Sequence, residues 1–144
     1  MDPLTKDKGN LGELKVMADL AAKGISIAQP YGDNLPFDLI AITRTDTNFS
    51  FTKVQVKHVA LRNGKIEIRA YSQKWNKTRI KSREAYKDHE VDIIAAYCPD
   101  VDKVFYVRYN EVVGNTFNIR VYPAKNNQKQ RVHLAEEYTE FPGP

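Results

Sequence analysis

Residues 36–57 read PFDLIAITRTDTNFSFTKVQVK, and they contain two apolar strand patterns separated by a polar stretch. The first pattern covers residues 38–42. The second covers about 49–59, with a break in its phase near Lys53. The polar residues 46–48 between the two patterns are typical turn formers, so the stretch predicts a β-hairpin.

The second strand pattern places chemically different side chains on its two faces. Because side chains alternate along a strand, Gln55 and Lys57 share one face, while Val54 and Val56 share the other. Asp38 opens the first strand, and in a hairpin it lies close to Gln55. A carboxylate, an amide and an ammonium group are therefore expected together on one surface.

An amphipathic helix is expected on the N-terminal side of this hairpin, over about 10–23. Asn10 is a suitable N-cap, Gly24 a suitable C-terminal stop, and Glu13 lies near the first turn, beside the apolar stripe. The stripe follows helical spacing: Leu11, Leu14, Met17, Ala18, Leu20 and Ala21. A short strand follows at 25–27.

On the C-terminal side, the pair Asn63-Gly64 is a strong hairpin signal, and alternating apolar residues follow it at 66–70. We expect residues 74–90 to be mostly helical. Continuously apolar residues at 92–97 predict a strand buried on both faces. Further strand patterns lie at 104–107 and 117–121. This order predicts an α/β (α+β mixed) fold, with a mixed sheet and helices packed on it.

Length and composition restrict the class of protein. The 144 residues fit a single domain over 1–144, and 42% hydrophobic with 28% charged residues is typical of a globular protein. A single cysteine, Cys98, excludes a disulfide framework. No apolar stretch is long enough to span a membrane, and the N-terminus has no signal-peptide core, so a cytoplasmic protein is expected.

The positive charge is concentrated in one segment. Residues 62–87 hold nine basic and two acidic side chains, a net charge of +7, whereas the remainder of the chain sums to −3. Such a segment indicates a polyanion binder. It begins directly after Lys57, and its candidate contacts to nucleic acid are Lys65, Arg69, Lys74, Lys77, Arg79, Lys81 and Arg83. The alternative is a solvated basic face.

Phosphodiester hydrolysis explains the group around Asp38. Mg²⁺ or a related cation such as Mn²⁺ prefers oxygen ligands, which Asp38, Gln55 and the carbonyl of Val56 offer, with Glu13 as a second carboxylate. Lys57 then orients the attacking water, neutralises developing charge or acts as a base. An exposed snorkelling lysine and an ordinary turn aspartate are the alternatives for Lys57 and Asp38.

These motifs resemble a known family. GELKVMADLAAKG (12–24), PFD (36–38) and QVK (55–57), in this order, are similar to the PD-(D/E)XK nuclease superfamily. The resemblance implies a restriction-endonuclease-like α-β-β-β-α-β core over about 9–97, with added C-terminal strands. The small bacterial homing endonucleases encoded in group I introns are the most similar group, and they also carry a glutamine in place of the usual acid.

The resemblance implies catalytic roles for Glu13, Asp38, Gln55 and Lys57 and a sequence-specific, metal-dependent double-strand DNA endonuclease. Cutting both strands needs two active sites, so at least a homodimer is expected, and the resemblance favours a tetramer. The interface is expected in 98–144; no other protein partner is inferred. A Holliday-junction nuclease and a non-catalytic nucleic-acid-binding relative remain alternatives, the latter because Gln55 removes one negative charge from the site.

Overall fold

The computed structural model describes residues 3–75, 81–86, 90–123 and 132–143. A five-stranded sheet in the order β1-β2-β3-β7-β8 forms its centre, and β3 pairs parallel to β7 while the other neighbours are antiparallel. Two antiparallel ribbons, β4–β9 and β5–β6, lie outside this sheet. The elements are α1 (Pro3–Ala22), β1 (Ser26–Ala28), β2 (Leu39–Arg44), β3 (Phe49–His58), β4 (Lys65–Arg69), β5 (Tyr71–Trp75), β6 (Lys81–Ala85), β7 (Ile93–Cys98), β8 (Lys103–Arg108) and β9 (Thr116–Arg120), with 3₁₀ turns at Tyr109–Glu111 and Ala135–Glu137.

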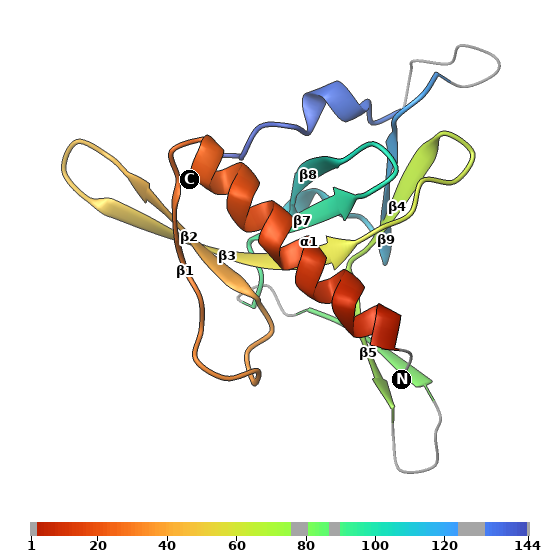
Figure 1. The fold of residues 1–144 in the computed structure, drawn as a ribbon, viewed down its shortest axis with the longest axis horizontal. Helices are drawn as coiled ribbons and strands as arrows, with labels where there is room; N and C mark the ends of the chain where they lie inside the picture. Colours follow the sequence, from red (N-terminus) through yellow and green to blue (C-terminus); the bar gives the residue numbers. More distant parts are fainter. Residues whose placement is uncertain (1–2, 76–80, 87–89, 124–131, 144) are drawn as a thin grey trace.

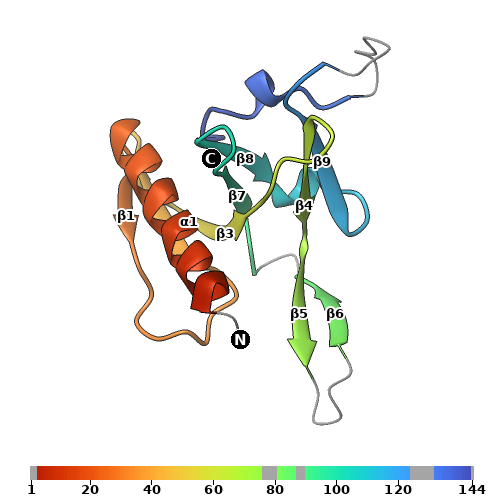
Figure 2. The same cartoon turned by 45° about the vertical axis from the view of Figure 1, so that its right-hand side comes forward.

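The molecule is layered around β3 and β7. Helix α1 crosses one face of the five-stranded sheet (Figure 1). In the rotated view, α1 and the β4–β9 ribbon lie on opposite sides of β3 and β7, and the β5–β6 ribbon projects beyond the sheet (Figure 2). This arrangement confirms the mixed α/β fold class expected from the sequence.

Strand β7 is buried on both faces, as its continuously apolar sequence predicts. Ile93 and Tyr97 pack into the core beneath α1, together with Val16 and Leu20 of the helix. Ile94 and the other alternate residues of β7 pack into a second core. This second core lies beneath the β4–β9 ribbon, so burial of apolar surface fixes both outer layers to the same strand.

Both turn signals in the sequence correspond to observed turns. The polar residues 46–48 join β2 to β3 in a hairpin. Asn63 and Gly64 have φ angles of 53° and 75°, and Arg62 and Lys65 exchange both backbone hydrogen bonds across them. Two central residues with positive φ define the type I′ turn that Asn-Gly favours. The strand after this turn, β4, pairs with β9 rather than with β3.

The prediction of a helix over 74–90 is wrong. The described residues of this segment form β6 and the end of β5, which pair in register from Tyr71↔Ala85 to Trp75↔Lys81; residues 76–80 and 87–89 lie outside the described part. The apolar residues of this segment do not repeat at helical spacing, whereas Tyr71 and Trp75 favour a strand. Pairing between β5 and β6 gives the backbone N–H and C=O groups their hydrogen-bond partners, so the segment needs no apolar stripe of the kind that stabilises a helix.

Among the described residues, no helix is long and apolar enough to cross a membrane.

Candidate active site

Asp38 lies where the pairing of β2 with β3 ends. Its backbone N–H donates to the carbonyl of Val54 at 2.9 Å, and its Oδ2 accepts the backbone N–H of Val56 at 2.8 Å. The carboxylate therefore accepts the β3 hydrogen bond that a backbone carbonyl of β2 would accept if the pairing continued. The N–H and C=O of one strand residue project to the same side, so the carbonyl of Val56 faces the side on which Asp38 lies.

Gln55 and Lys57 share the face of the sheet that carries the β4–β9 ribbon. Their partners on β7 are Ile94 and Ala96, whose side chains belong to the core beneath that ribbon. Asp38 is one step beyond the Leu39↔Val54 pair and thus stands opposite Gln55, as the hairpin register predicts. Asp38, Gln55 and Lys57 therefore share one face of the sheet, as expected from the sequence.

The ammonium group of Lys57 is held by two oxygen atoms from outside the sheet. Its Nζ lies 3.1 Å from the hydroxyl of Tyr86 and 3.4 Å from the carbonyl of Tyr71. Burial lowers the pKa of Lys57, the carboxylate of Asp38 opposes this shift, and the nearby charge of Arg69 adds to it. The lysine is therefore not a snorkelling surface residue.

Glu13 joins this group from α1. The helix approaches β3 closely at Gly12, where a Cβ atom would lie 3.5 Å from Val56. Burial raises the pKa of Glu13, and the charge of Asp38 raises it further, so the two carboxylates are electrostatically coupled. Burial also raises the pKa of Asp38, against the hydrogen bond from Val56 and the charge of Lys57, which lower it.

This donor set suits a hard divalent cation. Among the described residues, no group of three or more His, Cys, Asp and Glu side chains gathers in a metal-binding arrangement. The site offers instead two neighbouring carboxylates with raised pKa values, Glu13 and Asp38, beside an amide and a backbone carbonyl. A cation stabilises the ionised form of such carboxylates, and oxygen ligands completed by water are the set that Mg²⁺ prefers.

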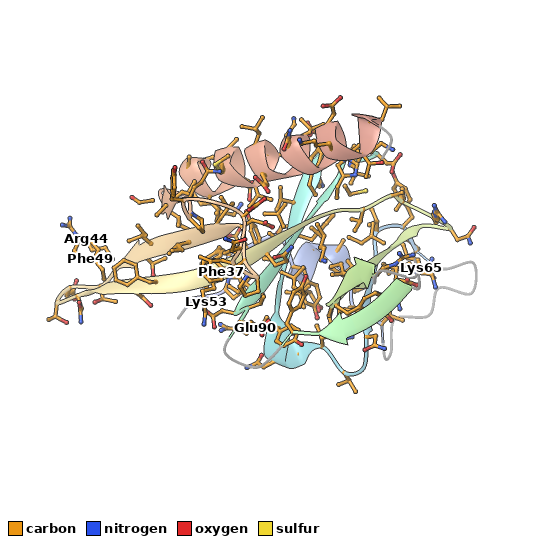
Figure 3. All side chains as sticks on the ribbon, turned by 90° about the horizontal axis from the view of Figure 1, so that it is seen from below. Phe37, Arg44, Phe49, Lys53, Lys65 and Glu90 are labelled. Carbon is orange, nitrogen blue, oxygen red and sulfur yellow. The ribbon has the colours of Figure 1, made fainter. Side chains whose placement is uncertain are left out.

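Two of the basic residues singled out in the sequence are described with their side chains. Lys65 and Arg69 alternate along β4 with Ile66 and Ile68, which are buried. Lys65 lies at the opposite end of the molecule from Arg44 and Phe49, at the tip of the β2–β3 hairpin (Figure 3).

The other basic residues are placed only by their backbone or not at all. Lys74 lies in β5, and Lys81 and Arg83 lie in β6; Lys77 and Arg79 are outside the described residues. Arg83 thus belongs to a strand and not to the helix expected over 74–90.

Comparison with known proteins identifies the family of the chain. A sequence profile described as PD-(D/E)XK endonuclease matches residues 4–141, almost the whole chain. The chain belongs to the PD-(D/E)XK endonuclease family. A solved structure described as a bacterial homing endonuclease, I-Ssp6803I, has the same fold, with a TM-score of 0.73 and 22% sequence identity over 93% of this chain and 87% of that one. No curated protein matches the sequence.

In this PD-(D/E)XK endonuclease, the two tyrosines that contact Lys57, Tyr71 and Tyr86, were not predicted from the sequence. Tyr86 lies inside the segment 74–90, for which the sequence predicts a helix. Tyr71 contributes a backbone carbonyl, which carries no sequence signal. Tyr86 reaches Lys57 only because β6 returns beside β5, a pairing between segments that periodicity does not detect.

The shifted pKa of Asp38 predicts a pH-dependent effect of Asp38→Asn on the free energy of unfolding. A carboxyl whose pKa is raised on folding binds more protons in the folded than in the unfolded state, so its stabilising contribution declines as pH rises through that window. The asparagine variant lacks this decline and can still accept the N–H of Val56. We expect it to gain stability relative to wild type between pH 4 and pH 7, measured by thermal unfolding without divalent cations. An equal difference at both pH values would contradict the assignment.

Proposed function

We propose that this PD-(D/E)XK endonuclease is a divalent-cation-dependent enzyme that cuts both strands of DNA at a specific sequence, as a homing endonuclease does. The observation that carries this proposal is the placement of Asp38, directly before β2, beside β3 with its Lys57, where the Asp38 carboxylate accepts the backbone N–H of Val56. Two neighbouring carboxylates beside a partly buried ammonium suit phosphodiester hydrolysis. The family profile that matches residues 4–141 spans all of these residues.

The proposed roles follow from the chemistry of each group. Asp38, Glu13, the amide of Gln55 and the carbonyl of Val56 would hold the cation, Mg²⁺ or Mn²⁺. Such a cation, when bound, polarises the scissile phosphate and acidifies a water molecule. Lys57 neutralises negative charge that develops on the phosphate, because its ammonium lies on the same face as Asp38. The hydrogen bond from Val56 keeps the Asp38 carboxylate oriented.

The β4 strand and the β5–β6 ribbon supply the proposed DNA-contacting surface. Arg69 lies close enough to lower the pKa of Lys57, so the basic segment adjoins the site. In β5–β6, Gln73 pairs with Arg83, and Trp75 with Lys81. A two-stranded antiparallel ribbon fits the major groove of B-DNA, where arginine and glutamine are common base-reading residues.

Double-strand cleavage by this chain requires a homo-oligomer. One chain carries one Asp38–Lys57 site, so symmetric cutting needs at least two copies, and a tetramer extends the contact with the target. The C-terminal part, 98–144, is the proposed interface. Light scattering of the protein bound to a target duplex should give at least twice the mass of one chain; a single 16.5 kDa subunit on the duplex would contradict the oligomer.

The first test is cleavage of a randomised duplex library in Mg²⁺, with Ca²⁺ and Asp38→Ala as controls, followed by sequencing of the ends. Ends that cluster at one long sequence, and that are lost in both controls, support the proposal. Cleavage of four-way junctions without sequence preference would instead identify a structure-specific nuclease. Bound but uncut DNA in all samples would indicate a non-catalytic relative.

The salt dependence of DNA binding tests the proposed surface. Lys65→Ala and Arg69→Ala should each reduce the slope of log K against log salt concentration by about 1, because each removes one phosphate contact. Arg44→Ala, at the opposite end of the molecule, is the matched control and should leave the slope unchanged (Figure 3). Fluorescence anisotropy between about 50 and 200 mM salt measures all four proteins. A slope equally reduced by Arg44→Ala would place the DNA elsewhere.

A further inference from the structure

We propose that Tyr86 is a positioning residue that fixes the ammonium group of Lys57 and thereby ties it to the base of the β5–β6 ribbon. Tyr86 belongs to none of the motifs that carry the family resemblance. The inference rests on the proposed function of the Asp38–Lys57 site, in which Lys57 acts on the phosphate and Tyr86 acts only through Lys57.

The contact between Tyr86 and Lys57 is partly buried, and it involves both the hydroxyl and the ring of the tyrosine. The side chain of Tyr86 is only 8% exposed, and its hydroxyl lies 3.1 Å from Lys57 Nζ, with the centre of its ring 5.5 Å from the same atom. Burial, and secondarily the charge of Asp38, raises the pKa of Tyr86 to about 12. The hydroxyl therefore stays protonated and neutral, and it offers a lone pair to the ammonium.

Tyr86 is itself held in place. The hydroxyl of Tyr109 donates to the backbone carbonyl of Tyr86 at 2.6 Å, and the two rings meet edge-to-face at 6.0 Å between centroids. Tyr86 also belongs to the core beneath the β4–β9 ribbon. A group anchored in this way can restrict the long, flexible side chain of a lysine.

Both groups that hold Lys57 come from the base of the β5–β6 ribbon. Tyr71 is the first residue of β5, it pairs with Ala85 at the end of β6, and Tyr86 follows directly. The carbonyl of Tyr71 completes the pair of acceptors around Nζ. The amine of Lys57 is thus placed by the same ribbon that is proposed to bind DNA.

The test compares Tyr86→Phe, which removes only the hydroxyl, with Tyr86→Leu, which removes the ring as well. Tyr97→Phe is the matched control, because it also removes one hydroxyl bound to a neighbouring side chain, Asp102, but on the α1 face of the sheet. We expect Tyr86→Phe to lower the single-turnover rate of DNA cleavage about 10- to 100-fold, in line with the loss of geometry at a reacting group. The Kd for DNA should stay within about twofold of wild type, and the control should cleave normally.

A second measurement needs no DNA. In protein with ¹³C-labelled lysine, the εCH₂ signal of Lys57 is assigned by its absence from Lys57→Met. We expect this signal to lie apart from those of solvent-exposed lysines, because Lys57 is held beside the Tyr86 ring. It should move toward them in Tyr86→Phe, which keeps the ring but releases the ammonium group, and stay in place in Tyr97→Phe. Chemical-shift changes elsewhere report whether the variants remain folded.

The two measurements separate failure of this inference from failure of the proposed function. A Lys57 signal that moves in Tyr86→Phe supports the positioning role, even if no sample, wild type included, cleaves DNA. A Lys57 signal that stays in place, or a folded Tyr86→Phe that cleaves at the wild-type rate, overturns it while leaving the nuclease proposal intact. A rate loss accompanied by an equal loss in Tyr97→Phe also overturns it.

Discussion

Replacement of Lys57 by methionine is expected to lower the single-turnover rate of DNA cleavage by about 10³-fold, the typical loss when one charge-stabilising group is removed. The Kd for DNA should change little, because in the proposed mechanism Lys57 acts on negative charge that develops only as the phosphate reacts. Rates are measured at saturating protein in Mg²⁺, and Kd values in Ca²⁺.

The same substitution should not destabilise the fold at neutral pH. Burial lowers the pKa of Lys57 in the folded state, so the unfolded state binds more protons, and the wild type becomes more stable as pH rises toward the ordinary pKa of lysine. Methionine removes this cost and fills similar space. We therefore expect a melting temperature at pH 7 at or above that of wild type.

Lys53→Met is the matched control, since Lys53 lies on the same strand and the same face and is paired with Asp92. Its rate at saturating protein should remain near wild type. A similar loss in both variants would show that positive charge along β3, rather than the position of Lys57, supports cleavage. A fully active Lys57→Met would remove the lysine from the mechanism.

Phe105→Ala is expected to reduce the free energy of unfolding by about 3–5 kcal/mol. Phe105 is 1% exposed and packs in the core between the sheet and the β4–β9 ribbon. The truncation leaves a cavity where that ribbon is fixed, so DNA contacts from Lys65 and Arg69 should weaken as well. Urea unfolding followed by fluorescence measures the change.

Phe51→Ala serves as the control for Phe105→Ala, because it removes the same atoms from a side chain that is 66% exposed. Folding buries little apolar surface at Phe51, so the free energy of unfolding is expected to change by no more than about 0.5 kcal/mol. Comparable losses in the two variants would indicate that Phe51 is covered in solution by another surface. A small loss for Phe105→Ala would contradict the tight packing of the second core.

Local chemistry accounts for what the sequence predicted correctly. The Asn63-Gly64 turn, the hairpin at 46–48 and the two-sided burial of β7 each depend on residues that are adjacent in the chain. The placement of Asp38 opposite Gln55 followed from the hairpin register alone. The roles of Glu13, Asp38, Gln55 and Lys57 in catalysis, in contrast, stay predictions for the experiments above.

Pairing between distant segments accounts for what was missed. Strand β4 finds its partner about fifty residues further along, in β9, and no local pattern identifies that choice. The error over 74–90 arose because a few apolar residues in a basic context were interpreted as a helix. The same error hid Tyr86, since its position beside Lys57 depends on the return of β6 along β5.

The two-sided burial of β7 has a consequence for how this chain tolerates change. Exchange of one aliphatic side chain for another of similar volume affects only one of the two cores. Insertion or deletion of a single residue within Ile93–Cys98 shifts the alternation by one and turns each following side chain to the opposite face. Both cores would then lose their fit at once, so natural and engineered length variation is expected in the loops of this protein and not in β7.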